Sequence, residues 1–420
     1  MMVNVNRKYK IYVCTEEYPF GHSEDPFINS ELEELEKNFE VIFISHMNRK
    51  DYKKAYRDQS GCSIKAFNID TKLKWYDKLK YFFKYLVDKD GIEEIKLIIQ
   101  SGGNVLYKIY QSVGFYALAM QNFKLMKKMN IISEKENFIY YTYWYFYYTY
   151  SMIKYKDRFP GMKVVTRAHG FDLYNERYKG ARQPFKIIMN NKIDRIAFIS
   201  LYGKKYYLKN YNLKDEDKYT VNRLGVQITK TKDAINIKNE GFRLVSCSSL
   251  ITLKRVDLLI RALSLLNDDI EWIHFGDGEE KEYIFKLTHE LLDKKKNIRY
   301  NLLGFVPNKK ISEYYQFNYV DCFISTSSSE GIPVSIQEAM SFGIPIIATD
   351  VGGVSELFDN NGILLTANPE PEEVANAIHN MMNADKDVYQ NWRSNSYRIC
   401  TEKYNAKRNS ASFVEMLKNM

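Results

Sequence analysis

The chain has 420 residues, of which 45% are hydrophobic and 27% are charged, and it contains 9 prolines. At about 150 residues per domain this length predicts two domains, and the composition excludes a disordered, collagen-like or low-complexity protein. The net charge of +9 is uneven, because residues 1–240 carry 42 basic against 28 acidic side chains, whereas residues 241–420 carry 19 against 24. A basic first half suits an anionic partner, either nucleic acid or an acidic membrane surface. A solvated lysine-rich surface explains the same charge.

Five scattered cysteines and the start of the chain point to the cytoplasm. No CxxC pair occurs, which disfavours a disulfide framework and a structural zinc site and fits a reducing compartment. We expect no signal peptide, because residues 1–9 are polar and basic and no apolar leader follows. The longest uncharged stretch, residues 137–153, is too short and too rich in tyrosine to span a membrane.

Short apolar runs alternate with helical periodicity through the first half, which predicts a mostly parallel, doubly wound α/β sheet. The predicted strands cover residues 10–15, 41–45, 138–142, 163–166 and 195–200, and the predicted helices cover 27–38 and 72–86. Residues 221–240 are polar and rich in lysine and asparagine, and we place a domain boundary within them.

The same alternation restarts after this boundary and predicts a second doubly wound domain. Its predicted strands cover 242–248, 270–276, 298–304, 322–326, 344–349 and 363–366; its helices begin at 256, 279 and 310 and cover 335–342 and 389–420. We therefore expect domains at 1–225 and 226–395 and a C-terminal helix over 396–420 that can pack back on the first domain. Two such domains in series face each other across a cleft, and ligands of open α/β sheets bind beyond the carboxyl ends of the strands.

The densest motif is Ser327–Leu357, SSSEGIPVSIQEAMSFGIPIIATDVGGVSEL. A strand ends at a serine cluster, Glu330 precedes a glycine and a proline, and a helix begins near Val334–Ser335, so its N-terminus can bind an anion such as a phosphate. Glu338 lies eight residues after Glu330, and both carboxylates can accept hydrogen bonds from sugar hydroxyls. A capped helix with surface acids is the alternative, but it does not explain why these residue types coincide at one strand end.

This motif resembles the donor-site signature of the retaining GT-B glycosyltransferases of family four, the group 1 glycosyltransferases. The resemblance covers nearly the whole chain and is strongest over 241–360. It implies that Glu330 binds hydroxyls of a nucleotide-sugar and that Glu338 binds the ribose. It further implies that the backbone between them meets the sugar and the diphosphate, at residues Gly331, Ile332, Pro333, Val334 and Ser335.

Further segments extend the resemblance. In Val245–Asp257 the family carries a lysine and an arginine against the diphosphate; Lys254 matches the lysine, whereas Ser249 stands at the arginine position. The adjacent Arg255 either replaces that arginine or is a surface residue. Other segments resemble the base-side loops and a loop near the donor phosphates, and they add the candidate residues Gly276, Gly278, Gly304, Phe305 and Gly21.

The segment Arg167–Tyr174, RAHGFDLY, follows a predicted strand of the first domain. It resembles the acceptor-domain motif of polysaccharide-assembling members of the family. By that resemblance His169 reaches the donor sugar at the reacting carbon, which makes His169, Glu330 and Lys254 the candidate catalytic residues. The candidates on the acceptor side are Arg167, Asp172, Tyr143 and Trp144.

The resemblance implies transfer of a hexosyl-type sugar from UDP or GDP with retention of configuration, by front-face attack of the acceptor hydroxyl. The cations and the helix N-terminus can stabilise the leaving diphosphate without a metal. We interpret the two DxD spellings, Asp88–Asp90 and Asp215–Asp217, as solvated surface, and we expect neither a metal nor another cofactor.

Residues 72–86 combine lysines with aromatic residues, which suits an anionic membrane, although a core-facing helix with a lysine-rich outer side has the same pattern. The expected function is therefore a cytoplasmic glycosyltransferase of bacterial surface-polysaccharide synthesis, of capsule or lipopolysaccharide. Its acceptor is a glycan or an undecaprenyl-diphosphate-linked glycan, and it can associate with the inner face of the membrane. The alternatives are a sugar-nucleotide epimerase, a degenerate transferase that acts as a scaffold, and a nucleic-acid-binding protein. The last lacks any recognisable binding motif.

Overall fold

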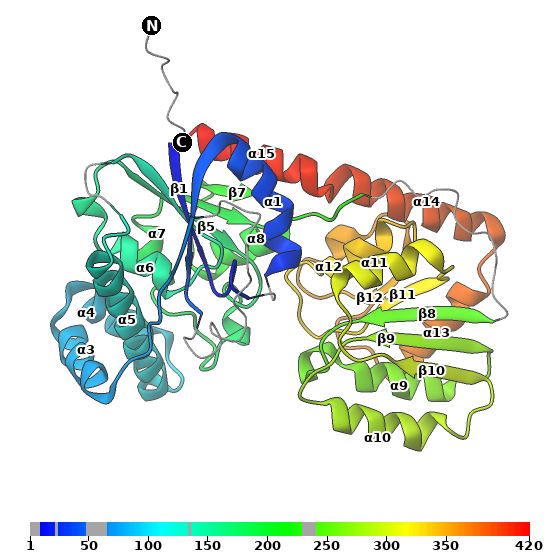
Figure 1. Ribbon diagram of the computed structural model, residues 1–420. Helices are drawn as coiled ribbons and strands as arrows, with labels where there is room; N and C mark the ends of the chain where they lie inside the picture. Colours follow the sequence, from blue (N-terminus) through cyan, green and yellow to red (C-terminus); the bar gives the residue numbers. More distant parts are fainter. Residues whose placement is uncertain (1–8, 22–23, 48–64, 133–135, 229–240) are drawn as a thin grey trace, which may run out of the picture. The chain divides into compact units, whose positions relative to one another are not determined.

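The computed structural model describes residues 9–21, 24–47, 65–132, 136–228 and 241–420 (Figure 1). The chain divides into two compact units, of which unit 1 is Met1–Asn222 together with Ser410–Met420 and unit 2 is Arg223–Asn409. Unit 1 thus ends three residues before the expected boundary at 225, and the last residues of the chain return to it.

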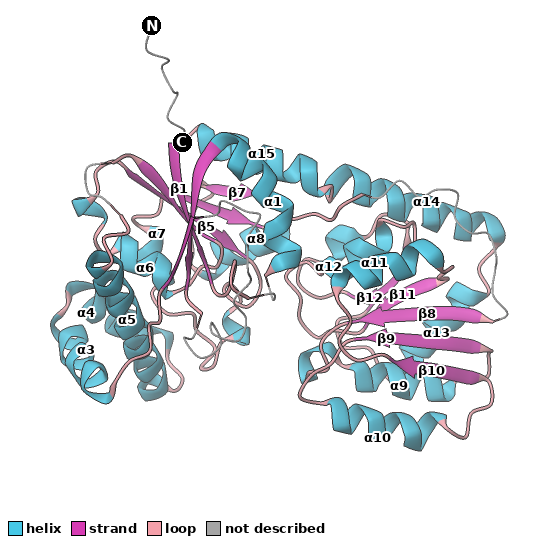
Figure 2. Cartoon of the chain, in the orientation of Figure 1, coloured by secondary structure: helices cyan, strands magenta, loops and turns pink. Residues whose placement is uncertain are grey.

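Unit 1 is built on a parallel sheet of seven strands in the order β3-β2-β1-β4-β5-β6-β7 (Figure 2). Its central strands β1, β4 and β5 are mostly buried along their length, as parallel strands covered on both faces are. The strands are β1 (Tyr9–Thr15), β2 (Phe39–Ser45), β3 (Lys65–Asn68), β4 (Phe138–Thr142), β5 (Met162–Ala168), β6 (Arg195–Phe198) and β7 (Tyr219–Val221). The five strands predicted in this half are confirmed, whereas the short edge strands β3 and β7 were not predicted.

The helices of unit 1 include one cluster that the sequence interpretation did not separate. α3 packs against α4 and α5, and together they form a layer beside the sheet (Figure 1). The helices are α1 (Asp25–Asn38), α3 (Trp75–Val87), α4 (Lys89–Ser101), α5 (Val105–Lys128), α6 (Tyr147–Ile153), α7 (Lys186–Asn190) and α8 (Leu201–Asn210). Short 3₁₀ turns occur at Lys156–Arg158 and Asn175–Arg177.

Unit 2 contains a parallel sheet of six strands in the order β10-β9-β8-β11-β12-β13. The strands are β8 (Phe242–Cys247), β9 (Ile270–Phe275), β10 (Ile298–Leu302), β11 (Cys322–Ser325), β12 (Ile346–Thr349) and β13 (Gly362–Leu365). The helices are α9 (Val256–Leu265), α10 (Lys281–Leu292), α11 (Asn308–Phe317), α12 (Val334–Met340), α13 (Pro371–Met382) and α14 (Lys386–Lys403), with 3₁₀ turns at Thr252–Lys254 and Val354–Leu357. The predicted doubly wound architecture is confirmed in both units.

The C-terminal segment differs from the single helix expected over 396–420. α14 ends at Lys403 and α15 (Ala406–Lys418) begins three residues later. The interruption has a local cause, because Asn405 forms a parallel bridge with Val226. The end of α15 belongs to unit 1, where Ser410 Oγ donates to the Ser30 carbonyl at 2.9 Å and the Phe413 ring lies 5.1 Å from that of Tyr141.

Each sheet has one point at which the strand order reverses, between β1 and β4 in unit 1 and between β8 and β11 in unit 2. Loops that leave neighbouring strands there diverge and create a binding crevice. No helix in the described part of the chain is long and apolar enough to cross a membrane.

Candidate functional site

The loops that follow β8 and β11 bring Lys254 and Glu330 together. Lys254 Nζ lies 2.5 Å from Glu330 Oε1, and both side chains are largely buried. A lysine and a carboxylate that meet at a reversal of strand order leave a charged pair where a ligand of an α/β sheet binds. Two of the three candidate catalytic residues are thus direct neighbours.

The loop that carries Lys254 is fastened to the loop after β11 by backbone contacts. The Leu253 carbonyl accepts from Ser328 N at 2.8 Å, and the Arg255 carbonyl accepts from Thr326 Oγ1 at 2.9 Å. The backbone on both sides of Lys254 is therefore held in place by the loop after β11. Such fixation is the requirement for a group that must meet a ligand in one geometry.

Arg255, for which the sequence left a donor-side role and a surface role open, binds the carbonyls of neighbouring loops. Its guanidinium donates to the carbonyls of Thr326 (2.7 Å), Ser327 (2.9 Å) and Ala367 (2.9 Å). Arg255 also has a left-handed backbone conformation, φ 47°. Arginine has five N–H groups and no acceptor, so a guanidinium that binds three carbonyls serves the fold. In this structure Arg255 links the loop after β8 to the loops after β11 and β13.

We therefore expect Arg255→Ala to lower the free energy of unfolding by about 1–3 kcal/mol, because three loop carbonyls lose a charged donor. Thermal or denaturant unfolding measures this effect. Arg261→Ala, which truncates an exposed arginine of the adjacent helix α9, is the matched control and should stay near wild type. An Arg255→Ala protein of unchanged stability that loses turnover would assign Arg255 the donor-side role instead.

Glu338 lies one turn into α12 and is held by a residue that the sequence interpretation missed. Asn308 Nδ2, at the start of α11, donates to Glu338 Oε1. Burial raises the pKa of Glu338 to about 7, and the Asn308 bond opposes that rise. Asn308 follows Val306-Pro307, and the proline just before a polar helix start was the available signal.

The segment Gly331–Pro333 is buried and packs against the turn at Gly352. Gly352 has φ 58°, and a Cβ there would lie 1.7 Å from the Glu330 carbonyl oxygen, so only glycine fits. Gly353 N donates to the Gly331 carbonyl at 2.9 Å. α12 begins at Val334, followed by Ser335, and its N-cap residue Pro333 provides no side-chain cap. The expected helix start is confirmed.

The loops after β9 and β10 join through their glycines. Gly276 N donates to the Gly304 carbonyl at 2.9 Å, and a Cβ on Gly276 would lie 1.7 Å from the Ser248 carbonyl oxygen. Phe305 is exposed, whereas Gly278 packs on the Leu250 backbone. These predicted residues lie at the carboxyl edge of the same sheet as Lys254 and Glu330.

Three buried polar side chains, linked by hydrogen bonds, lie behind this edge of the sheet. The sequence interpretation did not single them out. His274 Nδ1 lies 2.8 Å from Ser246 Oγ, which also accepts from Trp272 Nε1 at 2.9 Å. Burial lowers the pKa of His274 to about 4, so the ring is neutral at neutral pH. The three residues are neighbours on the sheet and fix the strand ends from which the loops start.

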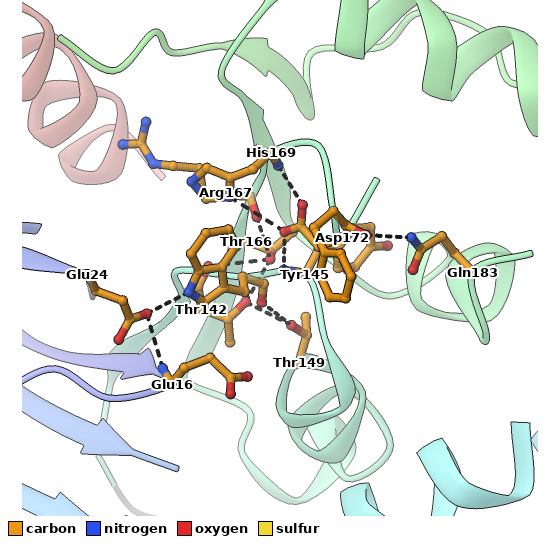
Figure 3. A network of polar contacts seen from close by, with 12 residues as sticks. Glu16, Glu24, Thr142, Tyr145, Thr149, Thr166, Arg167, His169, Asp172 and Gln183 are labelled. Carbon is orange, nitrogen blue, oxygen red and sulfur yellow. Dashed lines mark hydrogen bonds and ion pairs between the residues drawn. The ribbon is translucent and has the colours of Figure 1, made fainter. Parts of the chain in front are cut away.

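In unit 1 the loop after β5 carries His169 and Asp172, which lie side by side in Figure 3, and Trp144 of the loop after β4 packs against the histidine. The Trp144 and His169 ring centroids are 4.3 Å apart, and Asp172 Oδ2 lies 3.5 Å from His169 Nδ1. Nε2 of this buried histidine has no hydrogen-bond partner among the described residues, and the contact that Nδ1 makes there with Asp172 is long. Unpaired polar atoms in a buried side chain indicate a ligand or a catalytic role.

Asp172 itself is a positioning residue. Its carboxylate is fully buried and accepts from the backbone N–H groups of Tyr145 and His169, each at 2.8 Å. These bonds and the neighbouring histidine hold its pKa below the usual value although burial alone would raise it. The carboxylate thus fixes the loop that carries His169.

Two expected acceptor-side residues lie inside the fold and cannot contact an acceptor in this structure. Arg167 is only 1% exposed; its guanidinium pairs with Glu31, donates to Tyr141 Oη at 3.0 Å and to the Asn222 carbonyl at 2.9 Å. Tyr143 is equally buried. Of the four acceptor-side candidates, Trp144 alone is partly exposed.

The loop after β1, which contains Gly21, differs from a phosphate-binding loop. The Glu24 carboxylate accepts from the backbone N–H groups of Glu16, Glu17 and Tyr18, at 3.2, 2.7 and 2.8 Å, and Gly21 N donates to the Glu17 carbonyl. These N–H groups are therefore already satisfied. Glu24 also accepts from Trp144 Nε1 at 2.6 Å, which ties the loop to the His169 cluster. The neighbouring residue His22 lies outside the described residues.

The interpretation of the first DxD spelling as solvated surface is wrong. Lys154 Nζ lies 2.6 Å from Asp88 Oδ1 and 2.8 Å from Asp90 Oδ2, and all three side chains are largely buried. Asp215 is exposed and pairs with Lys204. Within the described residues no group of three or more His, Cys, Asp or Glu is arranged to hold a metal ion.

Comparison with known proteins agrees with this geometry. Residues 227–399 match the family described as Glycosyl transferases group 1. An O-antigen biosynthesis glycosyltransferase of Escherichia coli, WbnH, is 28% identical over 239 residues, covering 56% of this chain and 64% of WbnH. The alpha-monoglucosyldiacylglycerol synthase of Acholeplasma laidlawii is 28% identical over 208 residues, covering 43% of this chain and 49% of the synthase. The matches thus span about half to two thirds of these relatives.

Solved structures share the fold over nearly the whole chain. HepE of Anabaena in complex with UDP-glucose superposes with a TM-score of 0.65 at 16% identity, covering 98% of this chain and 100% of HepE. The sucrose-phosphate synthase of Thermosynechococcus elongatus gives a TM-score of 0.70 at 13% identity, covering 98% and 99%. Residues 227–399 are thus similar to the group 1 glycosyl transferases, and the two parallel sheets of the chain have the GT-B fold.

Proposed function

We propose that the protein transfers a hexosyl-type sugar from UDP or GDP to a glycan or lipid-linked glycan acceptor, with retention of configuration. The observation that carries this proposal is the Lys254–Glu330 pair beside the start of α12, at the reversal of strand order in the matched domain. The UDP-glucose complex of HepE, a protein of the same fold, supports a nucleotide-sugar as the donor.

In this proposal unit 2 binds the donor. The Glu330 carboxylate accepts from sugar hydroxyls, Glu338 accepts from the ribose, and the Lys254 ammonium stabilises the charge that grows on the leaving diphosphate. A fixed cation and uncapped N–H groups at Val334 and Ser335 can provide this stabilisation without a metal. The acceptor hydroxyl attacks the anomeric carbon on the side from which the diphosphate departs, and a departing phosphate oxygen takes the hydroxyl proton.

In this proposal unit 1 binds the acceptor, and His169 is its candidate catalytic residue. The names of two relatives, an O-antigen glycosyltransferase and a synthase of a glucosylated diacylglycerol, support a glycan or a lipid-linked acceptor. An undecaprenyl-diphosphate-linked glycan of bacterial surface-polysaccharide synthesis combines both features. Such an acceptor places the protein in the cytoplasm at the inner face of the membrane.

A panel of nucleotide-sugars tests the proposal. Ligand at about 100 times its Kd stabilises a folded protein by roughly 2.7 kcal/mol, so the right donor raises the melting temperature above that of the other sugars. Donor consumption is then measured with and without lipid-linked acceptors, in the presence of EDTA. Acceptor-dependent turnover that survives EDTA is expected, whereas turnover restored only by manganese or magnesium would overturn the metal-free mechanism.

The same assay separates the alternative activities. Conversion of the donor sugar without an acceptor identifies an epimerase. Donor binding without any turnover identifies a scaffold, for which Ser249 at the expected arginine position is the supporting observation. Failure of every nucleotide-sugar to bind contradicts the proposal itself.

We further expect the affinity for the donor to fall as the pH drops below about 7. Burial raises the pKa of Glu338 to about 7, so the carboxylate gains a proton and loses acceptor capacity below that pH. Isothermal calorimetry with the intact nucleotide-sugar measures this, because its diphosphate diester has no second titration in the same range. Glu338→Gln should bind more weakly and independently of pH between 6 and 8. A wild-type affinity that does not change across that range would remove Glu338 from the donor contacts.

A further inference from the structure

Helix α3 of unit 1 contacts helix α5 through one narrow face. Tyr81 and Tyr85 are buried, and their hydroxyls donate to Gln121 Oε1 at 3.2 Å and to Ser112 Oγ at 3.1 Å, both on α5. The Tyr85 ring also lies 5.5 Å from the Tyr116 ring of α5. Since residues four apart lie on one face of a helix, this face is the one that α3 turns toward the core.

The opposite face of α3 is apolar and exposed. Tyr76, Leu79, Phe83 and Leu86 follow each other at steps of three and four residues, which places them in one stripe, and they are 49%, 50%, 60% and 40% exposed. Trp75 and Val87, at the two ends of the helix, are more exposed still. A solvent-facing helix surface is normally polar, so a continuous apolar stripe on it marks a site of interaction.

The stripe is bordered by lysines. Residues 72–87 contain five lysines, all exposed, and Asp77 is the one acidic residue among them. Lys74 Nζ lies 5.7 Å from the Tyr76 ring and Lys80 Nζ 6.0 Å from the Tyr81 ring, so the ammonium groups lie beside the aromatic side chains. The complete set is Lys72, Lys74, Lys78, Lys80 and Lys84.

The helix is fixed in this orientation. Asp88 ends α3 and caps α4, and together with Asp90 it pairs with Lys154 of the loop after α6. On α4, Glu94 is fully buried, pairs with Arg182 and accepts from Phe185 N at 2.9 Å. Breaking a buried ion pair costs about 3–5 kcal/mol, so α3 cannot easily turn its apolar stripe inward.

We propose that the exposed face of α3 is a membrane-docking surface that binds the anionic head groups of a lipid bilayer with its lysines and inserts Leu79 and Phe83 at the acyl boundary. A helix of this kind lies in the plane of the interface and does not cross the membrane. The positive charge of the α3 surface favours an anionic lipid bilayer as its partner, because five lysines against one acidic residue are complementary to anionic head groups. A second copy of the chain would bring the same positive charge against itself.

The docking surface rests on the proposed function in one respect: a lipid-linked acceptor is presented at that bilayer. The structure also distinguishes the two interpretations that the sequence left open for residues 72–86, a membrane-binding helix and a core-facing helix with a lysine-rich outer side. The face away from the core is neither purely lysine-rich nor buried, but apolar with a basic border.

Co-sedimentation of the full-length protein with vesicles tests the surface. Vesicles of phosphatidylglycerol and phosphatidylcholine provide the anionic arm, and phosphatidylcholine alone provides the neutral arm. We expect binding to the anionic vesicles at 0.1 M salt that is lost at 1 M, where the screening length falls to about 3 Å. Absence of binding to anionic vesicles at low salt overturns the proposal.

Two sets of variants assign the binding to α3. Each lysine close to an anionic surface contributes about fivefold in affinity, so replacing Lys78, Lys80 and Lys84 by glutamine should weaken binding on the order of 100-fold. Leu79→Ser with Phe83→Ser should also release the protein from anionic vesicles. The matched controls lie in unit 2, where Lys286→Gln with Lys294→Gln changes two exposed lysines and Phe317→Ser changes an aromatic residue that is 61% exposed.

The remaining outcomes are equally decisive. Vesicle binding that persists in both α3 variants places the surface elsewhere and overturns the proposal. Self-association of the wild type that is lost in the Leu79/Phe83 variant identifies the stripe as an interface between copies instead. Melting temperature and donor affinity should match the wild type in every variant. Vesicle binding without any donor binding would contradict the proposed function and leave the docking surface standing.

Discussion

Replacing Lys254 by alanine is expected to lower kcat by about 10²- to 10³-fold while the fold remains intact. The loop after β8 that carries the ammonium is held by backbone contacts with the loop after β11, and the ammonium lies 2.5 Å from Glu330. Diphosphate charge grows as the glycosidic bond breaks, so the lysine interacts more strongly with the transition state than with the bound donor. Losing one preorganised electrostatic contact of this kind typically costs a factor of that size. Steady-state kinetics with saturating donor measure the loss.

The control must separate chemistry from the loss of an ion pair. Lys310 forms a comparable pair with Glu313, 2.7 Å apart, on the exposed side of α11, and Lys310→Ala should keep wild-type turnover. Lys254→Arg retains the charge but changes its geometry, and an intermediate kcat is expected because a guanidinium does not occupy the position of an ammonium. A Lys254→Ala enzyme with near-normal kcat would show that the phosphate site lies elsewhere.

His169→Ala is expected to reduce kcat by about 10²-fold and to leave donor affinity and melting temperature nearly unchanged. The His169 ring is buried against Trp144 and Tyr143, and its Nε2 has no hydrogen-bond partner within the described residues. Asp172 keeps its two backbone N–H donors when the imidazole is removed, so little stability is lost, whereas a hydrogen bond formed at the reacting sugar is lost from the transition state. Single-turnover rates together with donor titration separate the two effects.

A second histidine of unit 1 provides the matched control. His46 is also buried, but its Nδ1 lies 2.8 Å from the Thr15 carbonyl and its Nε2 lies 3.0 Å from Asn122 Oδ1. His46→Ala therefore leaves buried polar groups without partners and should lower the free energy of unfolding by about 1–3 kcal/mol. If His169→Ala behaved like His46→Ala, with lost stability and unchanged turnover, His169 would be a structural residue.

Much of the fold could be predicted because local sequence patterns indicate the strands and helices of parallel α/β domains. The runs at residues 138–142 and 322–326 are continuous and apolar, as strands covered on both faces must be. The predicted helix start at 334–335 follows a proline that cannot continue the preceding segment. The edge strands β3 and β7 were missed because they have three to four residues and little apolar content.

The position of Lys254 beside Glu330 was also accessible from the sequence. Each residue follows an apolar strand, and neighbouring strand ends of a parallel sheet meet at one edge. The spacing of Glu330 and Glu338 across a strand–helix junction then carried the resemblance to the donor-site motif. The order of the elements along the chain and the adjacency of the strands were sufficient to place Lys254 near Glu330.

By itself the sequence determined the alternating architecture, the motif at the end of β11 and the basic character of the first half, because each depends on residues close together in the chain. The tertiary structure alone decided which polar groups are already satisfied. Arg255 binds carbonyls of residues 326, 327 and 367, and Arg167 pairs with Glu31. Both guanidinium groups thus interact with residues that lie far away in the sequence. It also decided that α3 turns its apolar stripe outward. Periodicity fixes which residues share a helix face, whereas the partners that cover that face come from elsewhere in the chain.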